Sequence, residues 1–346
     1  MRIAIATVQV PFISGGAEIH AASLQRELRA RGHEAEIVSI PFKWYPPERL
    51  LDCMLMARLM DLTAVNGQPI DRVIALKYPA YYVEHPVKVC WVLHQHRQAY
   101  ELFGTPFSDL HDAVGRRVAE EIRRWDNALL PKVRAIYANS RTVSDRLKRF
   151  NAIDAEPLYH PPMNHALYRC ESFDDFILAP GRFDAMKRQH LLIEALALTK
   201  APVKAVLIGN SSGPYGDQVR ASIRQHGLEE RVKCLGIVEE STKLDLYARC
   251  LAVYNGVYEE DYGYITLEGF FASKPVVTHA DSGGPLEFVR SGENGFVTAP
   301  DALELARVLD RLHEERGLAE RMGTAGLATL HTLSISWDNV ISKLMQ

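Results

Sequence analysis

Two glutamates, Glu260 and Glu268, stand eight positions apart in the segment VYEEDYGYITLEGFFASKP, which spans residues 257–275. Glu260 follows a predicted strand, and Glu268 lies in an otherwise apolar segment that predicts a helix opening at Gly263. Acidic side chains near a helix start complement its dipole, which would explain the cluster without a ligand. That explanation does not require a charge among apolar residues, so we expect Glu268 to have a polar partner such as a ligand's hydroxyls.

A pair of cations follows an earlier predicted strand. FILAPGR ends at Arg182, and Lys187 lies five residues further on, at the start of a predicted helix. An arginine fork and a lysine charge near a helix N-terminus form a sensible clamp for a pyrophosphate. In the alternative interpretation both are surface residues and Lys187–Arg188 is a solvated pair. The position directly after a strand favours the anion site.

The first half of the chain offers three candidates. Gly15 and Gly16 lie between a predicted strand and a predicted helix, where glycine lets a ligand approach the backbone and helix N–H groups attract negative charge. A plain strand-to-helix turn explains them equally well. His94 ends the predicted strand VKVCWVLH, although a structural histidine is the commoner case. His94 and His96 could bind a metal, but no third ligand has a recognisable spacing, so we discount zinc.

Composition limits the function classes. The 346 residues fit two domains, and a net charge of −3 gives no overall attraction to nucleic acid or anionic lipid. The five cysteines lack a C-x-x-C spacing, which favours a reducing compartment. No apolar run reaches the roughly 18 residues that a membrane-spanning helix needs. The apolar N-terminus contains Gln9 and Pro11 and reads as a buried strand, not a signal peptide. We therefore expect a cytoplasmic protein.

Short apolar runs alternate with amphipathic segments twice along the chain, which predicts two doubly wound α/β domains. The expected strands of the first half are 2–8, 34–40, 71–78, 87–94, 134–140 and 156–160. Those of the second half are 176–182, 203–210, 231–236, 251–256 and 274–280. The segment 159–173 contains two prolines and is the expected linker. We predict domains at 1–165 and 166–330, and a C-terminal helix within 331–346 that packs back on the first domain.

Together these features resemble a retaining, nucleotide-sugar-dependent glycosyltransferase of family 4. Glu260 and Glu268 match the family's E-x7-E motif, Arg182 and Lys187 match its phosphate-binding pair, and SGGPLEFVRSGENGFV resembles its glycine-rich turn and the hairpin after it. The resemblance covers nearly the whole chain and is strongest from 176 to 297. It implies the GT-B fold, in which two Rossmann-like domains face each other across a cleft, with the acceptor side in the first and the donor side in the second.

The resemblance also implies residue roles. Arg182 and Lys187 would neutralise the donor's diphosphate, Glu260 would bind the sugar hydroxyls and Glu268 the ribose. Other donor contacts would come from Gly15, Gly16, His94, the backbone at Gly236 and Ile237, and the amides of Gly263 and Tyr264. The donor would be a UDP- or GDP-sugar. The acceptor would be a hydroxyl of a glycan, a lipid-linked molecule or a small molecule, as in cell-surface glycan assembly. No cofactor or metal is expected, and no D-x-D triplet is present.

Some features depart from the family or leave alternatives open. EGFFASKP is bulkier than the family's small-residue helix and lacks its glycine in the following turn, and HADSGG is unusual before the glycine pair. A sugar-nucleotide epimerase and a non-catalytic nucleotide-sugar binding protein share the fold. A missing G-x-G-x-x-G fingerprint disfavours an NAD-dependent oxidoreductase. The apolar segment 42–62 could be core, line an acceptor pocket, or contact a membrane.

Overall fold

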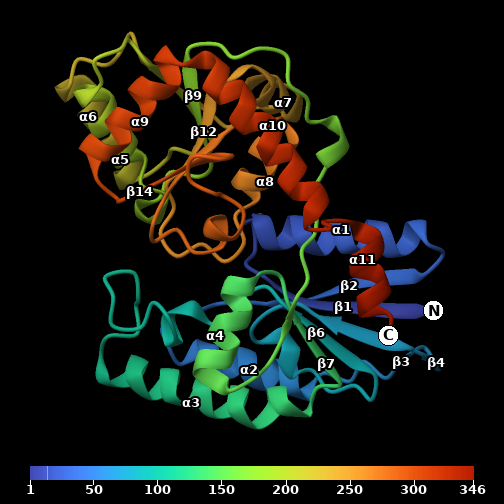
Figure 1. Ribbon diagram of the computed structural model, residues 1–346. Helices are drawn as coiled ribbons and strands as arrows, with labels where there is room; N and C mark the ends of the chain where they lie inside the picture. The colour runs from blue at the N-terminus through green and yellow to red at the C-terminus, as the bar shows by residue number, and fades with distance from the viewer. Residues whose placement is uncertain (14) are drawn as a thin grey trace. The chain divides into compact units, whose positions relative to one another are not determined.

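The computed structural model describes residues 1–13 and 15–346 and divides into two compact units, each built on a six-stranded sheet (Figure 1). Unit 1 comprises Met1–Met163 and Ser336–Gln346, and unit 2 comprises Asn164–Ile335. The sequence placed the boundaries after residues 165 and 330, where the structure places them after 163 and 335. Because Ser336–Gln346 belongs to unit 1, the chain's last helix packs within that unit.

The unit 1 sheet is entirely parallel, in the order β2-β1-β5-β6-β7-β8. Its strands are β1 (Arg2–Gln9), β2 (Glu34–Pro41), β5 (Arg72–Ala75), β6 (Lys88–Val92), β7 (Ala135–Ala138) and β8 (Glu156–Pro157). Each lies within or against an apolar run that the sequence predicted as a strand. A small antiparallel hairpin, β3 (Ala64–Val65) with β4 (Gln68–Pro69), was not predicted.

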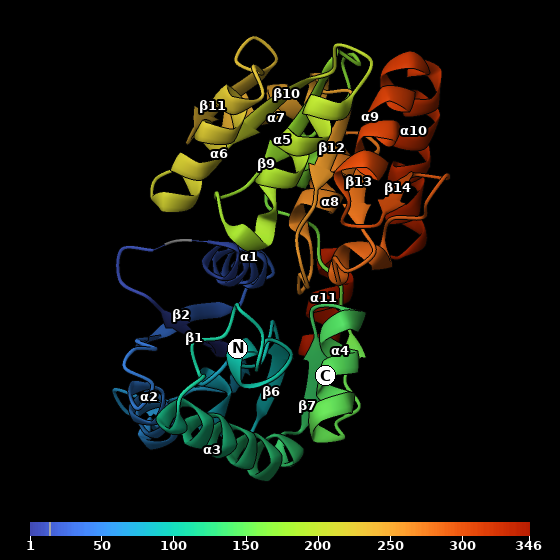
Figure 2. The same cartoon turned by 90° about the vertical axis from the view of Figure 1, so that its left-hand side faces the viewer.

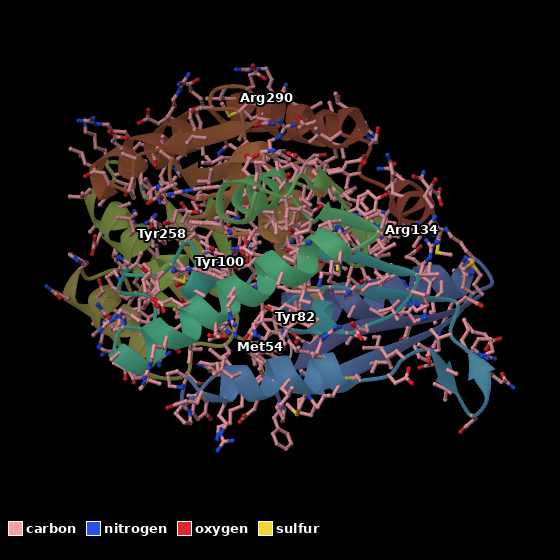
Figure 3. The ribbon with its side chains drawn as sticks, turned by 90° about the horizontal axis from the view of Figure 1, so that it is seen from below. Met54, Tyr82, Tyr100, Arg134, Tyr258 and Arg290 are labelled. Atoms are coloured by element: carbon pink, nitrogen blue, oxygen red, sulfur yellow. The ribbon has the colours of Figure 1, made fainter. Side chains whose placement is uncertain are left out.

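Side chains alternate along β1 and supply a separate core on each face of this sheet. Ala4, Ala6 and Val8 belong to the core that includes α2 (Arg49–Leu59), α3 (Ala113–Leu129) and α4 (Arg141–Asn151). Ile3 and Ile5 belong to the core that includes α1 (Gly16–Ala30) and α11 (Trp337–Leu344). Figure 3 shows α2 and α3 side by side, with Met54 and Tyr82 near their seam. Short 3-10 turns are η1 (Ala80–Tyr82), η2 (Arg97–Ala99) and η3 (Leu130–Lys132).

The unit 2 sheet is also parallel, in the order β11-β10-β9-β12-β13-β14, and Figure 2 shows it with β11 on the left and β14 on the right. Its strands are β9 (Phe176–Pro180), β10 (Lys204–Ile208), β11 (Val232–Gly236), β12 (Ala252–Asn255), β13 (Val276–His279) and β14 (Gly295–Thr298). No strand was predicted at Gly295–Thr298, and β14 pairs with β13 in parallel. The chain between them must therefore cross back over the sheet rather than turn tightly.

Helices accompany the strands of unit 2 on both faces of its sheet. They are α5 (Gln189–Leu198), α6 (Pro214–Gln225), α7 (Glu240–Arg249), α8 (Tyr264–Phe271), α9 (Ala302–Glu314) and α10 (Arg316–Thr332). Three 3-10 turns complete the unit: η4 (His165–Leu167), η5 (Ala185–Lys187) and η6 (Gly284–Glu287). One core includes side chains of α5, α6, α9 and α10, while α8 packs against β12, β13 and α10.

Candidate functional site

The candidate residues of unit 2 follow its strands at the carboxyl edge of the sheet. Arg182 and Lys187 come after β9, Glu260 after β12, and Gly236–Ile237 at the end of β11. Because β9 and β12 are neighbours in the sheet, their following loops meet. Since β10 lies between β9 and β11, Gly236–Ile237 occupies another part of the same edge.

Lys187 and Glu260 form an ion pair between their side chains. Each side chain is about a quarter exposed, at 27% and 22%, so the pair is reachable from solvent. The two loops are also joined through the backbone, since the N–H of Tyr258 donates to the carbonyl of Met186 at 2.7 Å. The sequence named both residues as separate ligand contacts, and the structure brings them together with each charge compensated.

A tight turn at the glycine pair fixes the backbone of Glu260. Its N–H donates to the carbonyl of Ser282 at 3.0 Å, and its carbonyl accepts the N–H of Gly284 at 2.8 Å. Gly283 has a φ of +66°, and a Cβ there would lie 2.5 Å from the Glu260 carbonyl oxygen. Only glycine fits this position, which explains the SGG sequence.

Arg182 has a different environment from Lys187. Its side chain is 67% exposed and forms an ion pair with Asp184 at 3.2 Å. An exposed guanidinium with one nearby carboxylate keeps donors available for an anion. The structure is therefore compatible with the anion-binding role that the sequence predicted for Arg182.

Gly263 precedes α8, as predicted, and adopts a φ of +92° as its N-cap. The N–H of Thr266 donates to the Gly263 carbonyl, which begins the helical hydrogen bonding. The first amides of a helix have no partner within the helix, and those of Gly263 and Tyr264 lie at this end. A Cβ at position 263 would come within 2.9 Å of Pro285.

Glu268 projects from α8 and is held by two side chains of α7. The Tyr247 hydroxyl donates to its Oε2 at 2.6 Å, and the Lys243 ammonium donates to its Oε1 at 3.3 Å. The side chain of Glu268 is 15% exposed. Its charge therefore has the polar partners that the sequence predicted, but these are protein side chains. Burial of Glu268 does not by itself require a ligand there.

Gly236 and Ile237 form the end of β11 and its exit. Gly236 has a φ of +70°, and its carbonyl accepts the N–H of Gly209 at 2.7 Å. Ile237 is 78% exposed. An open backbone beside an exposed apolar side chain is a suitable surface for a planar, partly apolar group.

The unit 1 candidates lie at the carboxyl edge of their own sheet. Gly15 is the N-cap of α1, and Gly16 is its first residue. The N–H of Gly15 donates to the Glu18 carboxylate at 2.8 Å, so a protein group already uses that amide. His94 follows β6, is partly buried, and its Nδ1 lies 2.6 Å from the Gln95 carbonyl.

Sequence reasoning missed several residues near these candidates. Lys77 follows β5 and is partly buried, and burial lowers the pKa of its ammonium while the nearby charge of Glu18 opposes that shift. Its position directly after the run RVIAL could have identified Lys77 as a site candidate from the sequence. Lys243 and Tyr247 had no such signal in the sequence, because only the fold brings them next to Glu268.

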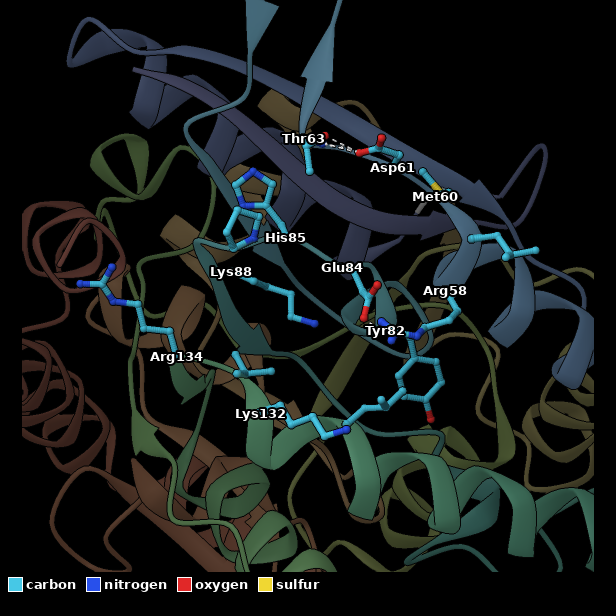
Figure 4. Close-up of a pocket in the computed structure, with 14 residues that line it drawn as sticks. Arg58, Met60, Asp61, Thr63, Tyr82, Glu84, His85, Lys88, Lys132 and Arg134 are labelled. Atoms are coloured by element: carbon cyan, nitrogen blue, oxygen red, sulfur yellow. Dashed lines mark hydrogen bonds and ion pairs between the residues drawn. The ribbon is translucent and has the colours of Figure 1, made fainter.

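A cavity of about 650 Å³ in unit 1 is lined in part by residues 58–61 of the segment 42–62, and by none of the individually predicted site residues. Figure 4 shows Lys88, Lys132 and Arg134 among its lining side chains, which precede or begin β6 and β7 at the amino edge of the sheet. Within residues 1–13 and 15–346, no group of three His, Cys, Asp or Glu side chains could hold a metal ion. None of the helices in that part of the chain is long and apolar enough to cross a bilayer.

Residues 171–328 match the family model described as "Glycosyl transferases group 1". Human alpha-1,3/1,6-mannosyltransferase ALG2 is 25% identical over 209 residues, covering 53% of this chain and 50% of that protein. An uncharacterized glycosyltransferase of Methanocaldococcus jannaschii is 24% identical over 384 residues, covering 99% of this chain and 96% of that protein. The chain thus spans about half the length of the human relative. These matches support a glycosyltransferase.

Two solved structures align with the full length of the chain. Sucrose-phosphate synthase from Thermosynechococcus elongatus gives a TM-score of 0.79 at 18% identity, covering 100% of this chain and 98% of that one. HepE of Anabaena, solved in complex with UDP and glucose, gives 0.71 at 20% identity, covering 100% of both chains. At these identities the likeness shows the fold alone. The fold is GT-B, with two parallel-sheet α/β domains, as the sequence predicted.

Proposed function

We propose that this protein is a retaining, metal-independent glycosyltransferase of family 4 that moves a sugar from a nucleoside diphosphate donor to a hydroxyl acceptor. The supporting observation is the Lys187–Glu260 pair at the carboxyl edge of unit 2, inside the segment that matches the family model. A cation for the leaving diphosphate stands in contact with a carboxylate suited to sugar hydroxyls.

The pair also suggests how binding proceeds. A diphosphate carries more negative charge than Glu260 and competes for Lys187. Once Lys187 turns to the phosphate, the Glu260 carboxylate accepts hydrogen bonds from the sugar. Arg182 adds a second cation, and the amides of Gly263 and Tyr264 face the developing negative charge of the leaving group.

The remaining donor contacts follow the sequence assignment. Glu268, oriented by Tyr247, would accept from the ribose hydroxyls, and the backbone at Gly236–Ile237 would contact the base. Gly15, Gly16 and His94 would contribute from unit 1. We propose a UDP- or GDP-sugar as the donor, since HepE was solved with UDP and the human relative is named a mannosyltransferase. The acceptor would be a glycan, lipid-linked or small-molecule hydroxyl in cell-surface glycan assembly.

Glu260→Gln tests the assignment. We expect nucleotide release from the productive donor to fall at least tenfold, because a hydrogen bond to a charged group is worth about 1.5–3 kcal/mol. Glu230→Gln, an exposed glutamate of the same unit, is the matched control and should leave the rate unchanged. A wild-type rate for Glu260→Gln contradicts the proposal.

The same assay separates the two alternatives. Conversion of the donor to an isomer without any acceptor would identify an epimerase. Donor binding without transfer or hydrolysis across a broad acceptor panel would identify a binding protein. The anomeric configuration of the product, read by NMR, tests retention.

We also propose that the protein works in the cytoplasm at the inner face of the membrane, with α2 as its contact. Buried residues of α2 form core, but Leu55, Met56 and Leu59 are 51%, 43% and 73% exposed. Leu59 also lines the cavity that contains Lys132 and Arg134. Exposed apolar side chains beside cations suit an anionic lipid surface.

Sedimentation with phosphatidylcholine vesicles, with and without phosphatidylglycerol, tests this contact. We expect binding only with the anionic lipid, a large loss for Leu55→Glu, and about a fivefold loss for Lys132→Ala. Leu303→Glu on α9 is the control, because Leu303 is similarly exposed at 47%. Equal binding of Leu55→Glu and wild type contradicts the proposal.

A further inference from the structure

Arg188, the residue after Lys187, is engaged inside unit 2 and is not a solvated cation. Its guanidinium donates to both carboxylate oxygens of Asp281, each at 2.7 Å, and its side chain is 15% exposed. It also lies over the ring of Tyr258 at 5.1 Å. Burial raises the pKa of the Asp281 carboxyl, but hydrogen bonds and charge from Arg188 outweigh it and hold that pKa below its ordinary value. The pair is therefore ionised at neutral pH.

The backbone of Arg188 is in a conformation that favours glycine. Its φ and ψ are +54° and +39°, the left-handed region, which costs free energy for a residue with a Cβ. Two contacts oppose that cost. The guanidinium is bound to Asp281, and the Arg188 carbonyl accepts the hydroxyl of Tyr254 at 3.3 Å.

The Arg188–Asp281 pair joins the turn that carries Lys187 to the loop after β13, which is hydrogen-bonded to the loop of Glu260. Asp281 follows β13, and its carbonyl accepts the N–H of Glu259 at 2.9 Å. The next carbonyl, of Ser282, accepts the N–H of Glu260 at 3.0 Å. The pair thus connects the neighbour of Lys187 in the chain with the backbone that holds Glu260.

We propose that Arg188 and Asp281 are positioning residues that hold Lys187 and Glu260 in register for the donor. This inference rests on the proposed function for its effect on binding. Neither residue needs to touch the donor, because the guanidinium fork of Arg188 is occupied by Asp281. Without the pair, the turn at 185–188 keeps the Tyr258–Met186 backbone hydrogen bond and the Lys187–Glu260 ion pair but loses its anchor on the loop after β13, so Lys187 takes up a wider range of positions.

Arg188→Gly is the sharpest variant, because glycine favours the left-handed backbone while it removes the guanidinium. A loss in this variant therefore reports the missing ion pair and not a strained turn. Asp281→Ala removes the other partner, and the double variant completes a mutant cycle. Arg188→Lys retains one charge without the fork and should recover part of the loss.

The first measurement needs no donor. Lysine acetylation followed by mass spectrometry gives the reactivity of Lys187 relative to the exposed Lys233 of the same unit. We expect Arg188→Gly and Asp281→Ala each to raise Lys187 reactivity several-fold, the double variant to equal the singles, and Arg188→Lys to lie between. Unchanged Lys187 reactivity in both single variants overturns the proposal, whatever the protein's activity.

The second measurement is calorimetric binding of UDP, GDP and their glucose and mannose derivatives. We expect Arg188→Gly to lower the affinity for the donor about tenfold relative to wild type. Its unfolding midpoint should stay close to that of wild type. Weakening by Glu260→Gln but not by Arg188→Gly would refute the positioning role and leave the proposed function standing. Absence of donor binding and transfer in wild type would refute the function, while the Lys187 reactivity still decides the positioning.

Discussion

At the scale of single residues, both glutamates of the 257–275 segment have protein partners, but of different kinds. Glu260 pairs with Lys187 from another loop, and a diphosphate can compete with Glu260 for that lysine. Glu268 is held by two side chains of α7 at once, through a short hydrogen bond from the Tyr247 hydroxyl at 2.6 Å and an ion pair with Lys243 at 3.3 Å. We infer that Glu260 changes partner when a donor binds, whereas Glu268 keeps its orientation.

Asp126 gives a prediction about pH at the same scale. This α3 carboxylate is fully buried and accepts the hydroxyls of Tyr82 and Tyr100, each at 2.6 Å. Burial raises its pKa to about 6 from 3.8, although the tyrosine hydrogen bonds oppose the rise. Between these values the folded protein holds a proton that the unfolded chain releases, so stability falls as pH rises from about 4 to about 6.

Asp126→Asn removes this titration and keeps the shape of the side chain. Well above pH 6 the wild type has lost roughly 3 kcal/mol that the variant does not lose, at 1.36 kcal/mol per pKa unit. Thermal unfolding of both proteins from pH 4 to pH 7 checks this, since the difference between them cancels other titrating groups. A difference independent of pH contradicts the prediction.

At the scale of elements, the apolar runs predicted the strands of both sheets except β14 and the small β3–β4 hairpin. A strand buried on both faces needs a continuous apolar run, which the sequence displays directly. The segment Gly295–Thr298 begins with glycine and is only four residues long, so its pairing with β13 is a tertiary property. Residues after strands were predictable as site candidates for the same reason.

The contacts that orient those candidates were not predictable. Tyr247 and Glu268 are 21 residues apart in the chain, and Arg188 and Asp281 are 93 apart. No local period or propensity relates such pairs, and many other charged residues could have formed them. Sequence reasoning therefore identified residues that could contact a ligand and missed those that hold them.

The unusual bulk of α8 also has a tertiary explanation. Phe270 is fully buried, and a Cβ at Gly326 of α10 would lie 2.4 Å from its ring. The larger side chain on one helix is thus accommodated by a glycine on the other. The turn after α8 lacks glycine, and Ser273 takes the left-handed conformation there, with a φ of +51°.

At the scale of the whole molecule, the two units differ in how the chain builds them. Unit 2 is one continuous segment with its own core, and it contains the family match and every candidate donor residue from Arg182 to Glu268. Unit 1 is built from two separate segments, residues 1–163 and residues 336–346. Trp337, Val340, Ile341 and Leu344 of α11 are buried in its core.

Separate expression of the units tests this difference. We expect the fragment 164–335 to fold alone and to bind UDP or GDP, because it has its own core and contains the contacts proposed for the diphosphate, ribose and base at Arg182, Lys187, Gly236, Ile237 and Glu268. The fragment 1–163 should not fold stably, since each missing large side chain is worth about 1.5–3 kcal/mol against a total stability of roughly 5–15 kcal/mol. Fusing 336–346 to it through a flexible linker should restore cooperative unfolding. Circular dichroism melts and calorimetry provide the measurements, and a cooperative melt of 1–163 alone would contradict the assignment of α11 to unit 1.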